Sequence, residues 1–139
     1  MDFRKIASIG SIVLGVLLVI GSLGTAFMVS STLADQRITT PDDAVCLPDR
    51  EVTGPFTAFC QARTIDRNVL ETTDGQTYAE LDREDERRAV AQSAAFLQAS
   101  LFTSVLAFGV AAMAFGMGVL FVLIGLGIRD VSERVVDRG

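Results

Sequence analysis

An apolar run from Leu101 to Ile128 contains 28 residues without one charge. At a rise of about 1.5 Å per residue, a helix of this length would reach roughly 42 Å, which exceeds the ~30 Å hydrocarbon core of a bilayer. A water-soluble chain of 139 residues has no core large enough to bury a helix that is apolar on every face. The run therefore predicts a membrane-spanning helix.

A second apolar run, Ile6–Ser30, lies near the N-terminus and is also uncharged. Because Arg4 and Lys5 precede it, a secretory signal is the competing interpretation. The apolar core of a signal is about 7–15 residues long and ends in a small-x-small cleavage site. This run is longer, and the STLA sequence that follows at 31–34 is a poor cleavage site. We expect an uncleaved span.

Charges near the ends of the two runs indicate the topology. The outer flanks together carry five basic and four acidic residues, whereas the middle segment carries seven basic and thirteen acidic. Basic residues favour the cytoplasmic side, so both termini are expected in the cytoplasm. The sequence thus predicts a multi-pass plasma-membrane protein. Its predicted parts are a cytoplasmic head (1–5), transmembrane helix 1 (6–30), an extracytoplasmic loop or cap (31–100), transmembrane helix 2 (101–128) and a cytoplasmic tail (129–139).

The cap is predicted to contain one helix of its own, from Pro55 to about Thr72. Proline suits the first helical position, and Asp74–Gly75 is typical of a helix stop. A β-hairpin that turns at Asp74–Gly75 is the alternative. The apolar side of this helix would carry Ala58, Phe59, Ala62, Ile65, Val69 and Leu70, with Asp66 interrupting it.

The acidic run Asp82–Glu86 is typical of the first turn of a helix, with Asp82 as its cap. Glu84 lies four residues before Arg88, a favourable spacing for an ion pair on a helix. No charged residue occurs between Arg88 and Arg129. We expect one helix over 82–128 whose first turns project roughly 25–30 Å from the bilayer.

Small residues recur along both apolar runs at alternating spacings of three and four, with Leu18 and Phe121 each filling one position of the repeat. Small side chains allow membrane helices to approach closely, and a repeat that averages 3.5 residues per turn suits a left-handed pair. The alternative is that glycine and alanine are simply common in membrane helices. The predicted helix-packing stripe consists of Ser8, Ser11, Gly15, Ser22 and Thr25 in the first run and Ser104, Ala107, Ala111, Ala114, Gly118 and Gly125 in the second.

Cys46 and Cys60 are the only cysteines, and both fall in the predicted external cap. An even cysteine count outside the cytoplasm favours a disulfide. Closing this loop would stabilise the cap by roughly 3 kcal/mol in the chain-entropy model. A redox-active pair is disfavoured because there is no CxxC motif, and zinc needs about four ligands, which two cysteines without any histidine cannot supply.

The composition excludes several classes of function. A net charge of −5 with a single lysine disfavours nucleic-acid binding. The acidic run Asp82–Glu86 lacks the ligand spacing of a calcium loop, and Gly116–Met117–Gly118 lacks the context of a nucleotide fingerprint. Neither apolar run holds an ionisable residue that could relay protons or coordinate ions. We expect no cofactor, no metal and no enzymatic activity.

Several segments resemble a family of small actinobacterial two-span membrane proteins. They are LADQRIT, GPFTAF, DGQTYAELD and AAFLQASLFTSVLAFGVAAMAFG, and the resemblance covers about Ile6–Ile128. Members of that family are often labelled aromatic ring-opening dioxygenase. Such enzymes of the extradiol type hold iron with two histidines and a carboxylate, and this chain has no histidine. The resemblance therefore implies the two-span architecture and not the dioxygenase chemistry.

Together these features predict an all-α membrane protein, an antiparallel two-helix transmembrane hairpin with a mostly helical extracytoplasmic cap. The expected function is a non-enzymatic accessory or scaffolding subunit of a larger envelope or respiratory membrane complex. Its expected partners are other membrane-protein subunits and the lipid bilayer. The alternative is an extracytoplasmic binding module that holds a lipid or small ligand near Phe56, Phe59 and Phe96.

Overall fold

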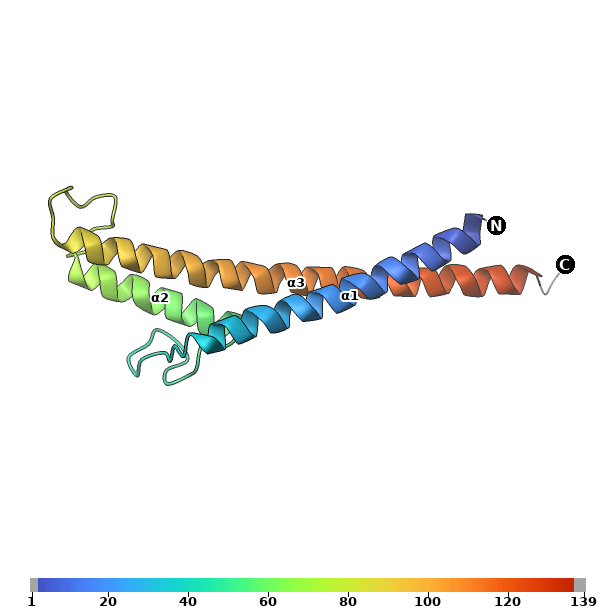
Figure 1. The fold of residues 1–139 in the computed structure, drawn as a ribbon, viewed down its shortest axis with the longest axis horizontal. Coiled ribbons are helices and arrows are strands. Elements are labelled where there is room, and N and C mark those ends of the chain that lie inside the picture. The colour runs from blue at the N-terminus through green and yellow to red at the C-terminus, as the bar shows by residue number, and fades with distance from the viewer. Residues whose placement is uncertain (1–2, 137–139) are drawn as a thin grey trace. The chain divides into compact units, whose positions relative to one another are not determined.

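The structure, a computed structural model, describes residues 3–136, with side chains described as far as Val131. It contains three helices, α1 (Phe3–Asp35), α2 (Pro55–Thr72) and α3 (Arg87–Val136) (Figure 1). The strand-like pairing found among these residues is one isolated antiparallel bridge between Thr39 and Glu51. The predicted all-α class is confirmed, and so is the α2 helix.

The two long helices, α1 and α3, contain 33 and 50 residues and are long and apolar enough to cross a membrane. Helix α1 starts before Ile6 and continues past Ser30 to Asp35, the first charged residue after Lys5. Helix α3 continues through the first residues of the predicted tail as far as Val136. Residues 1–2 and 137–139 lie outside the described part of the chain. Both helices are longer than the apolar runs that predict them.

The predicted start of α3 at Asp82 is wrong, because the helix begins at Arg87. The backbone N–H of Asp85 donates to the Asp82 carbonyl at 3.1 Å, which closes a turn in the acidic run. The Asp85 carboxylate then accepts a hydrogen bond from the backbone N–H of Arg87 at 2.9 Å. Asp85 therefore satisfies a free donor of the first helical turn, the role that the sequence pattern assigned to Asp82.

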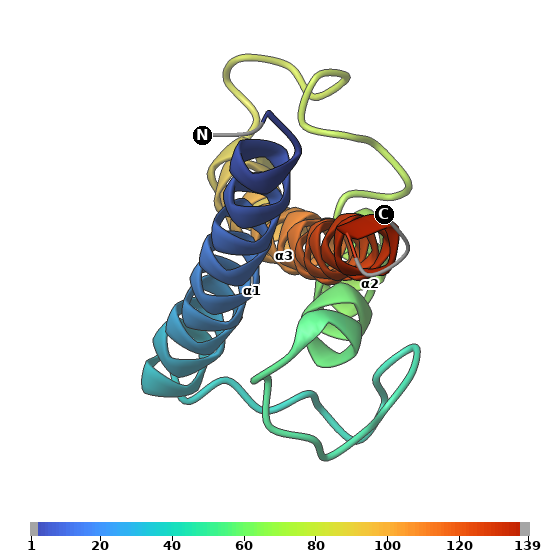
Figure 2. The same ribbon diagram turned by 90° about the vertical axis from the view of Figure 1, so that its right-hand side faces the viewer.

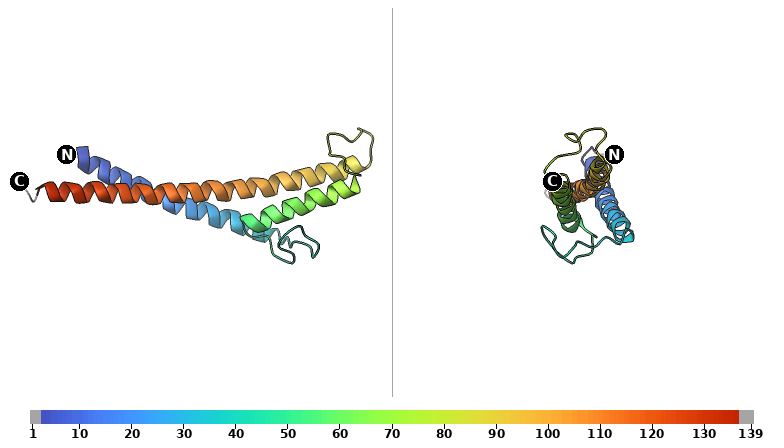
Figure 3. Two further views of the ribbon diagram at one scale, coloured as in Figure 1. Left: turned by 180° about the vertical axis from the view of Figure 1, so that it is seen from behind. Right: turned by 90° about the vertical axis from the view of Figure 1, so that its left-hand side faces the viewer.

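The chain divides into two compact units, and α1 and α3 run through both. The first unit contains the described residues up to Phe27 and those from Gly109 onward. In this unit α1 and α3 lie against each other and run in opposite directions, as the end-on view shows (Figure 2). The N-terminal end of α1 and the C-terminal end of α3 therefore lie at the same end of the unit (Figure 3).

The second unit, Met28–Phe108, contains the end of α1, the whole of α2, the start of α3 and their connections. Its buried apolar core consists of Leu33, Val52, Ala58, Ala62 and Leu101, with Val29, Ile38, Ile65, Val105 and Phe108 packed against it. The small side chains of Ala58 and Ala62 allow α2 to pack closely on its neighbours. The sequence assigns Phe59 to the apolar side of α2, but in the structure its side chain is 45% exposed.

Local hydrogen bonds fix both ends of α2. At its start, the Thr57 hydroxyl accepts the backbone N–H of Gly54 at 3.2 Å. At its end, the N–H of Gly75 donates to the Leu70 carbonyl at 2.7 Å, and Asp74 and Gly75 adopt left-handed φ values of 54° and 81°. This pattern is a Schellman-type helix end. Asp74–Gly75 thus stops α2 as expected, and the alternative hairpin at this position is wrong.

Candidate functional site

The small-residue stripe of the first unit forms the contact between α1 and α3. Its buried members repeat every seven residues on both helices, and because the helices run in opposite directions Ser8 meets Gly125 and Gly15 meets Gly118. A seven-residue repeat keeps one side of a helix on its partner over several turns. The buried positions are Ser8, Gly15 and Ser22 on α1 and Ala111, Gly118 and Gly125 on α3.

The glycines of the stripe place the two backbones in direct contact. A Cβ atom on Gly15 would lie 2.5 Å from the Gly118 carbonyl oxygen, and one on Gly118 would lie 2.7 Å from the Gly15 carbonyl oxygen. A Cβ atom on Gly125 would lie 2.8 Å from the carbonyl oxygen of Ser8. These distances are shorter than van der Waals contact, so the helices can be this close only because these three residues are glycine.

Two serines of the stripe are buried and use their hydroxyl groups differently. The Ser8 hydroxyl donates to the Gly125 carbonyl oxygen on α3 at 2.8 Å. The Ser22 hydroxyl donates to the Val19 carbonyl oxygen of its own helix at 2.8 Å. Ser8 therefore links the two helices, whereas Ser22 contributes a small side chain and satisfies its own polar group.

The remaining predicted stripe residues are less buried. Ser11 and Ala114 are half-buried in the first unit, and Ser104 and Ala107 are half-buried in the second. Thr25 is exposed and donates to the Gly21 carbonyl of its own helix, so it does not belong to the stripe. At six further glycines of the two long helices, a Cβ atom would meet no atom within 4 Å, which leaves their surfaces open: Gly10, Gly21, Gly24, Gly109, Gly116 and Gly127.

An apolar groove also lies along α1 and α3 in the first unit. It has a volume of about 270 Å³ and is lined by Val16, Val19, Ile20, Val119, Val122 and Leu123. The lining contains no polar surface, so the groove suits a hydrocarbon chain or an apolar side chain.

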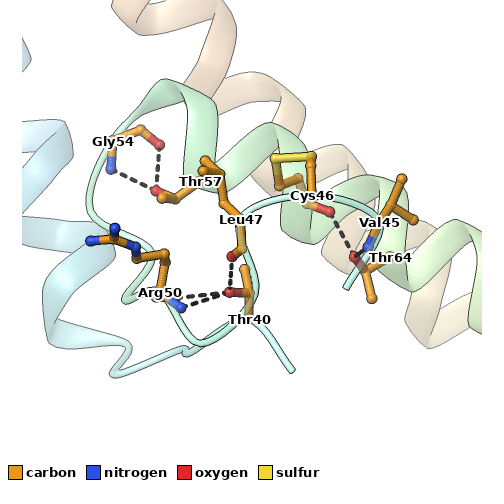
Figure 4. The surroundings of a disulfide bond; sticks show 9 residues. Thr40, Val45, Cys46, Leu47, Arg50, Gly54, Thr57 and Thr64 are labelled. Carbon is orange, nitrogen blue, oxygen red and sulfur yellow. Dashed lines mark hydrogen bonds between the residues drawn. A yellow bond between two sulfur atoms is a disulfide. The ribbon is translucent and has the colours of Figure 1, made fainter. Parts of the chain in front are cut away.

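The predicted disulfide between Cys46 and Cys60 is confirmed, with a Cα–Cα distance of 5.3 Å (Figure 4). It joins the connection between α1 and α2 to the first turns of α2. One turn further along α2, the Thr64 hydroxyl accepts the backbone N–H of Val45 at 3.1 Å and donates to the Cys60 carbonyl. The disulfide and this hydroxyl together hold the connection against one side of α2.

Thr40 organises the same connection, and nothing in the sequence marks it out. Its buried hydroxyl donates to the Leu47 carbonyl and accepts the backbone N–H of Arg50 at 2.9 Å (Figure 4). Its own backbone N–H donates to the Arg50 carbonyl at 2.9 Å. Thr40 therefore closes the loop that carries Cys46.

The connection between α2 and α3 is held by two arginines. Arg87 contacts the carboxylates of Asp74 and Asp85, each at 2.8 Å. Arg88 lies over the ring of Tyr78, 4.2 Å from its centroid, and donates to the Leu81 carbonyl. The predicted pairing of Arg88 with Glu84 is thus replaced, because the late start of α3 removes the helical spacing on which that pairing depends.

Hydrogen bonds shift the pKa values of three ionisable groups in the connection between α2 and α3. Those from the Arg87 side chain and backbone lower the pKa of Asp85, while the Asp85 side chain raises the pKa of Arg87. The backbone N–H and the hydroxyl of Thr77 lower the pKa of Glu80. Each shift stabilises the charged form of its group, in keeping with the part that all three groups take in the hydrogen bonds of this loop.

In the part of the chain that the structure describes, no group of three or more His, Cys, Asp or Glu residues could hold a metal ion. Both cysteines are in the disulfide. Comparison with protein-family models, with curated proteins and with solved structures finds no match.

Proposed function

We propose that this chain is a two-span membrane protein with an extracytoplasmic cap, and that it acts as a non-enzymatic accessory or scaffolding subunit of a larger envelope or respiratory membrane complex. The same two-span architecture is what the resemblance to the small actinobacterial proteins implies. Its partners would be other membrane-protein subunits.

The burial of the long helices supports the membrane location. Only 11% of the most apolar stretch of either helix is buried, whereas the core helix of a soluble protein would be mostly buried. Leu17, Ile20, Met113 and Leu120 are among the many large apolar side chains that are more than half exposed. In water such a surface would aggregate, and in a bilayer it faces lipid tails.

The contact through the small-residue stripe supports the interpretation of α1 as a membrane span and not as a cleaved signal. If α1 were removed, Gly118 and Gly125 would lose the backbone on which they pack, and the Gly125 carbonyl would lose the Ser8 hydroxyl. The charges agree with a hairpin, because Lys5 and Arg129 flank the two apolar runs at the end of the first unit where α1 begins and α3 ends. This arrangement favours cytoplasmic termini and an external cap.

The observation that carries the accessory role is the division of the glycines into two sets. Gly15, Gly118 and Gly125 are occupied by the contact between α1 and α3. The six open glycines remain on the outer surfaces of the same helices, where another membrane helix could approach the backbone closely.

Purification of the tagged protein from native membranes in mild detergent tests this role. We expect a stoichiometric partner that is lost in the variants Gly21→Leu and Gly116→Leu, because both fill an open surface without touching the stripe. Leu17→Met is the matched control, since it replaces one exposed, bulky apolar side chain by another and should keep the partner. Recovery of a lone protein under the same conditions would contradict the accessory role.

The apolar groove favours a second candidate function, the binding of a lipid or a small apolar ligand. Phe56 and Phe96 are exposed and project from the surface, so the expected ligand site near the phenylalanines has less support than the groove. Native mass spectrometry of the purified protein should then show a retained lipid that Val16→Trp displaces. Equal lipid retention by the variant would argue against the groove as a binding site.

A further inference from the structure

The first turns of α2 expose two aromatic side chains on the surface of the second unit. Phe56 is 77% exposed and Phe59 is 45% exposed. Spacings of three and seven residues place Phe59 and Arg63 on the same side of α2 as Phe56. This side is distinct from the one that carries Ala58 and Ala62 into the core. An exposed aromatic pair followed by an arginine requires an explanation other than packing within the cap.

A hydrogen bond shows which part of α1 lies beside the start of α2. The Ser30 hydroxyl of α1 donates to the carbonyl oxygen of Thr53, the residue before the Gly54 cap of α2, at 2.7 Å. Ser30 is the last residue of the apolar run and lies five residues before Asp35, a distance of about 7.5 Å along a helix. The start of α2 is therefore beside the uncharged part of α1, more than one turn before its charged end.

An aromatic contact shows which part of α3 lies beside the first turns of α2. The rings of Phe59 and Phe102 meet edge to face with their centroids 6.1 Å apart. Phe102 belongs to the apolar run that starts at Leu101, and Leu106, one turn further along, is 68% exposed. The exposed phenylalanines of α2 thus continue the apolar surface of α3 within the second unit.

Arg63 indicates what the exposed aromatic surface of α2 contacts. It lies one turn beyond Phe59 on the same side of α2, and its side chain is exposed. Among the described residues no ion pair or hydrogen bond of its guanidinium is found. Phenylalanines at one level and an arginine one turn above match the boundary of a lipid leaflet, where acyl chains meet phosphate groups.

We propose that the first two turns of α2 lie in the outer interfacial layer of the bilayer, with Phe56 and Phe59 among the upper acyl chains and Arg63 at the phosphates. This inference rests on the proposed membrane location and extends it to a third, non-spanning helix. The occupant of the aromatic surface is the phospholipid leaflet, and a protein partner is the alternative outcome of the test.

Tryptophan fluorescence can test the position of α2, because the chain contains no tryptophan. Three single-tryptophan variants, Phe56→Trp, Met113→Trp and Val90→Trp, each replace an exposed apolar side chain. They are reconstituted in vesicles whose phospholipids are brominated either near the headgroup or near the chain end. Met113, near the middle of the second apolar run, is the embedded control, and Val90, twelve residues before Phe102 on α3, is the aqueous control.

We expect Phe56→Trp to emit at shorter wavelength than Val90→Trp and to lose at least twofold in intensity with lipids brominated near the headgroup. Met113→Trp should be quenched most by lipids brominated near the chain end. If Phe56→Trp is quenched no more than Val90→Trp while Met113→Trp is quenched, the spans are in the bilayer and the inference about α2 is wrong. If Met113→Trp is not quenched either, both the proposed membrane location and this inference fail.

Discussion

Gly15 and Gly118 each occupy the space that a side chain of the other would need. A Cβ atom on Gly15 would lie 2.5 Å from the Gly118 carbonyl oxygen, and the reverse distance is 2.7 Å. Since both obstacles are backbone atoms, no side-chain rotation can relieve them. The pair therefore fixes the distance between α1 and α3 at this point of the first unit.

The first prediction is that Gly15→Ala separates the two helices. The added methyl group must push the backbones apart, and such overpacking costs about 1–3 kcal/mol. Gly10→Ala is the matched control, because a methyl group there meets no atom within 4 Å. Spin labels on α1 and α3 in bilayers should show a larger interhelical distance in Gly15→Ala alone. Equal distances in both variants would mean that the helices do not pack through Gly15.

Ser8→Ala should weaken the same contact only slightly. The variant keeps a small side chain but loses the 2.8 Å hydrogen bond to the Gly125 carbonyl. Hydrogen bonds between membrane helices contribute about 0.6 kcal/mol on average, so a loss of this size is expected. Ser8→Leu adds bulk at a buried position and should cost more. Both effects can be measured by denaturant titration of the protein in mixed micelles, and a reversed order would contradict the close contact.

Thr40→Val should loosen the connection between α1 and α2. Valine keeps the shape of threonine but leaves the Arg50 N–H and the Leu47 carbonyl without the hydroxyl that pairs them. Both hydrogen bonds are part-buried, and each contributes about 0.5–1.5 kcal/mol. Hydrogen exchange at the Arg50 amide should become faster, whereas exchange at α3 amides should not change. Unchanged exchange at Arg50 would show that Thr40 does not organise the loop.

The start of α3 should be sensitive to acid. Because Arg87 lowers the pKa of Asp85 in the folded protein below its ordinary value of 3.8, the ionised carboxylate stabilises the fold above 3.8. That contribution is lost as the pH falls through the lowered pKa. NMR shifts of the Arg87 amide should therefore titrate below pH 3.8 in the wild type and stay flat in Asp85→Asn. A midpoint above 3.8 would contradict the assigned pairing.

Removal of the disulfide should destabilise the cap and leave the first unit unaffected. Cys46→Ser opens a loop with a sequence separation of 14, which should cost roughly 3 kcal/mol in the chain-entropy model. Limited proteolysis should cut the 36–54 connection at least tenfold faster in the variant. The interhelical distance at Gly15 and Gly118 is the internal control, and it should match the wild type.

The helix contact was predictable because it depends only on the spacing of residues along a helix. Side chains seven residues apart return to nearly the same side, so Ser8, Gly15 and Ser22 can be assigned to one surface without knowledge of the partner. The exclusion of Thr25 could not be predicted in this way. It lies in line with the repeat, but its side chain is exposed and bonds within α1.

The cap was less predictable because its contacts join residues that are distant in sequence. The pairing of Cys46 with Cys60 follows from there being two cysteines, but Thr40 resembles any other loop threonine. The start of α3 was misplaced since several acidic residues can each cap a helix, and only the contact of Asp85 with Arg87 selects among them. The exposure of Phe56 likewise depends on which side of α2 the core occupies.

The central claim, a membrane hairpin with an external cap, can be tested by labelling intact cells with a membrane-impermeant maleimide. Cys46 should be unreactive at first and should react after mild reduction, because the disulfide blocks it and the cap is outside. Lys5→Cys, at the predicted cytoplasmic end of α1, is the control and should react only after the cells are permeabilised. Reaction of Lys5→Cys on intact cells, or protection of Cys46 after reduction, would contradict the proposed topology.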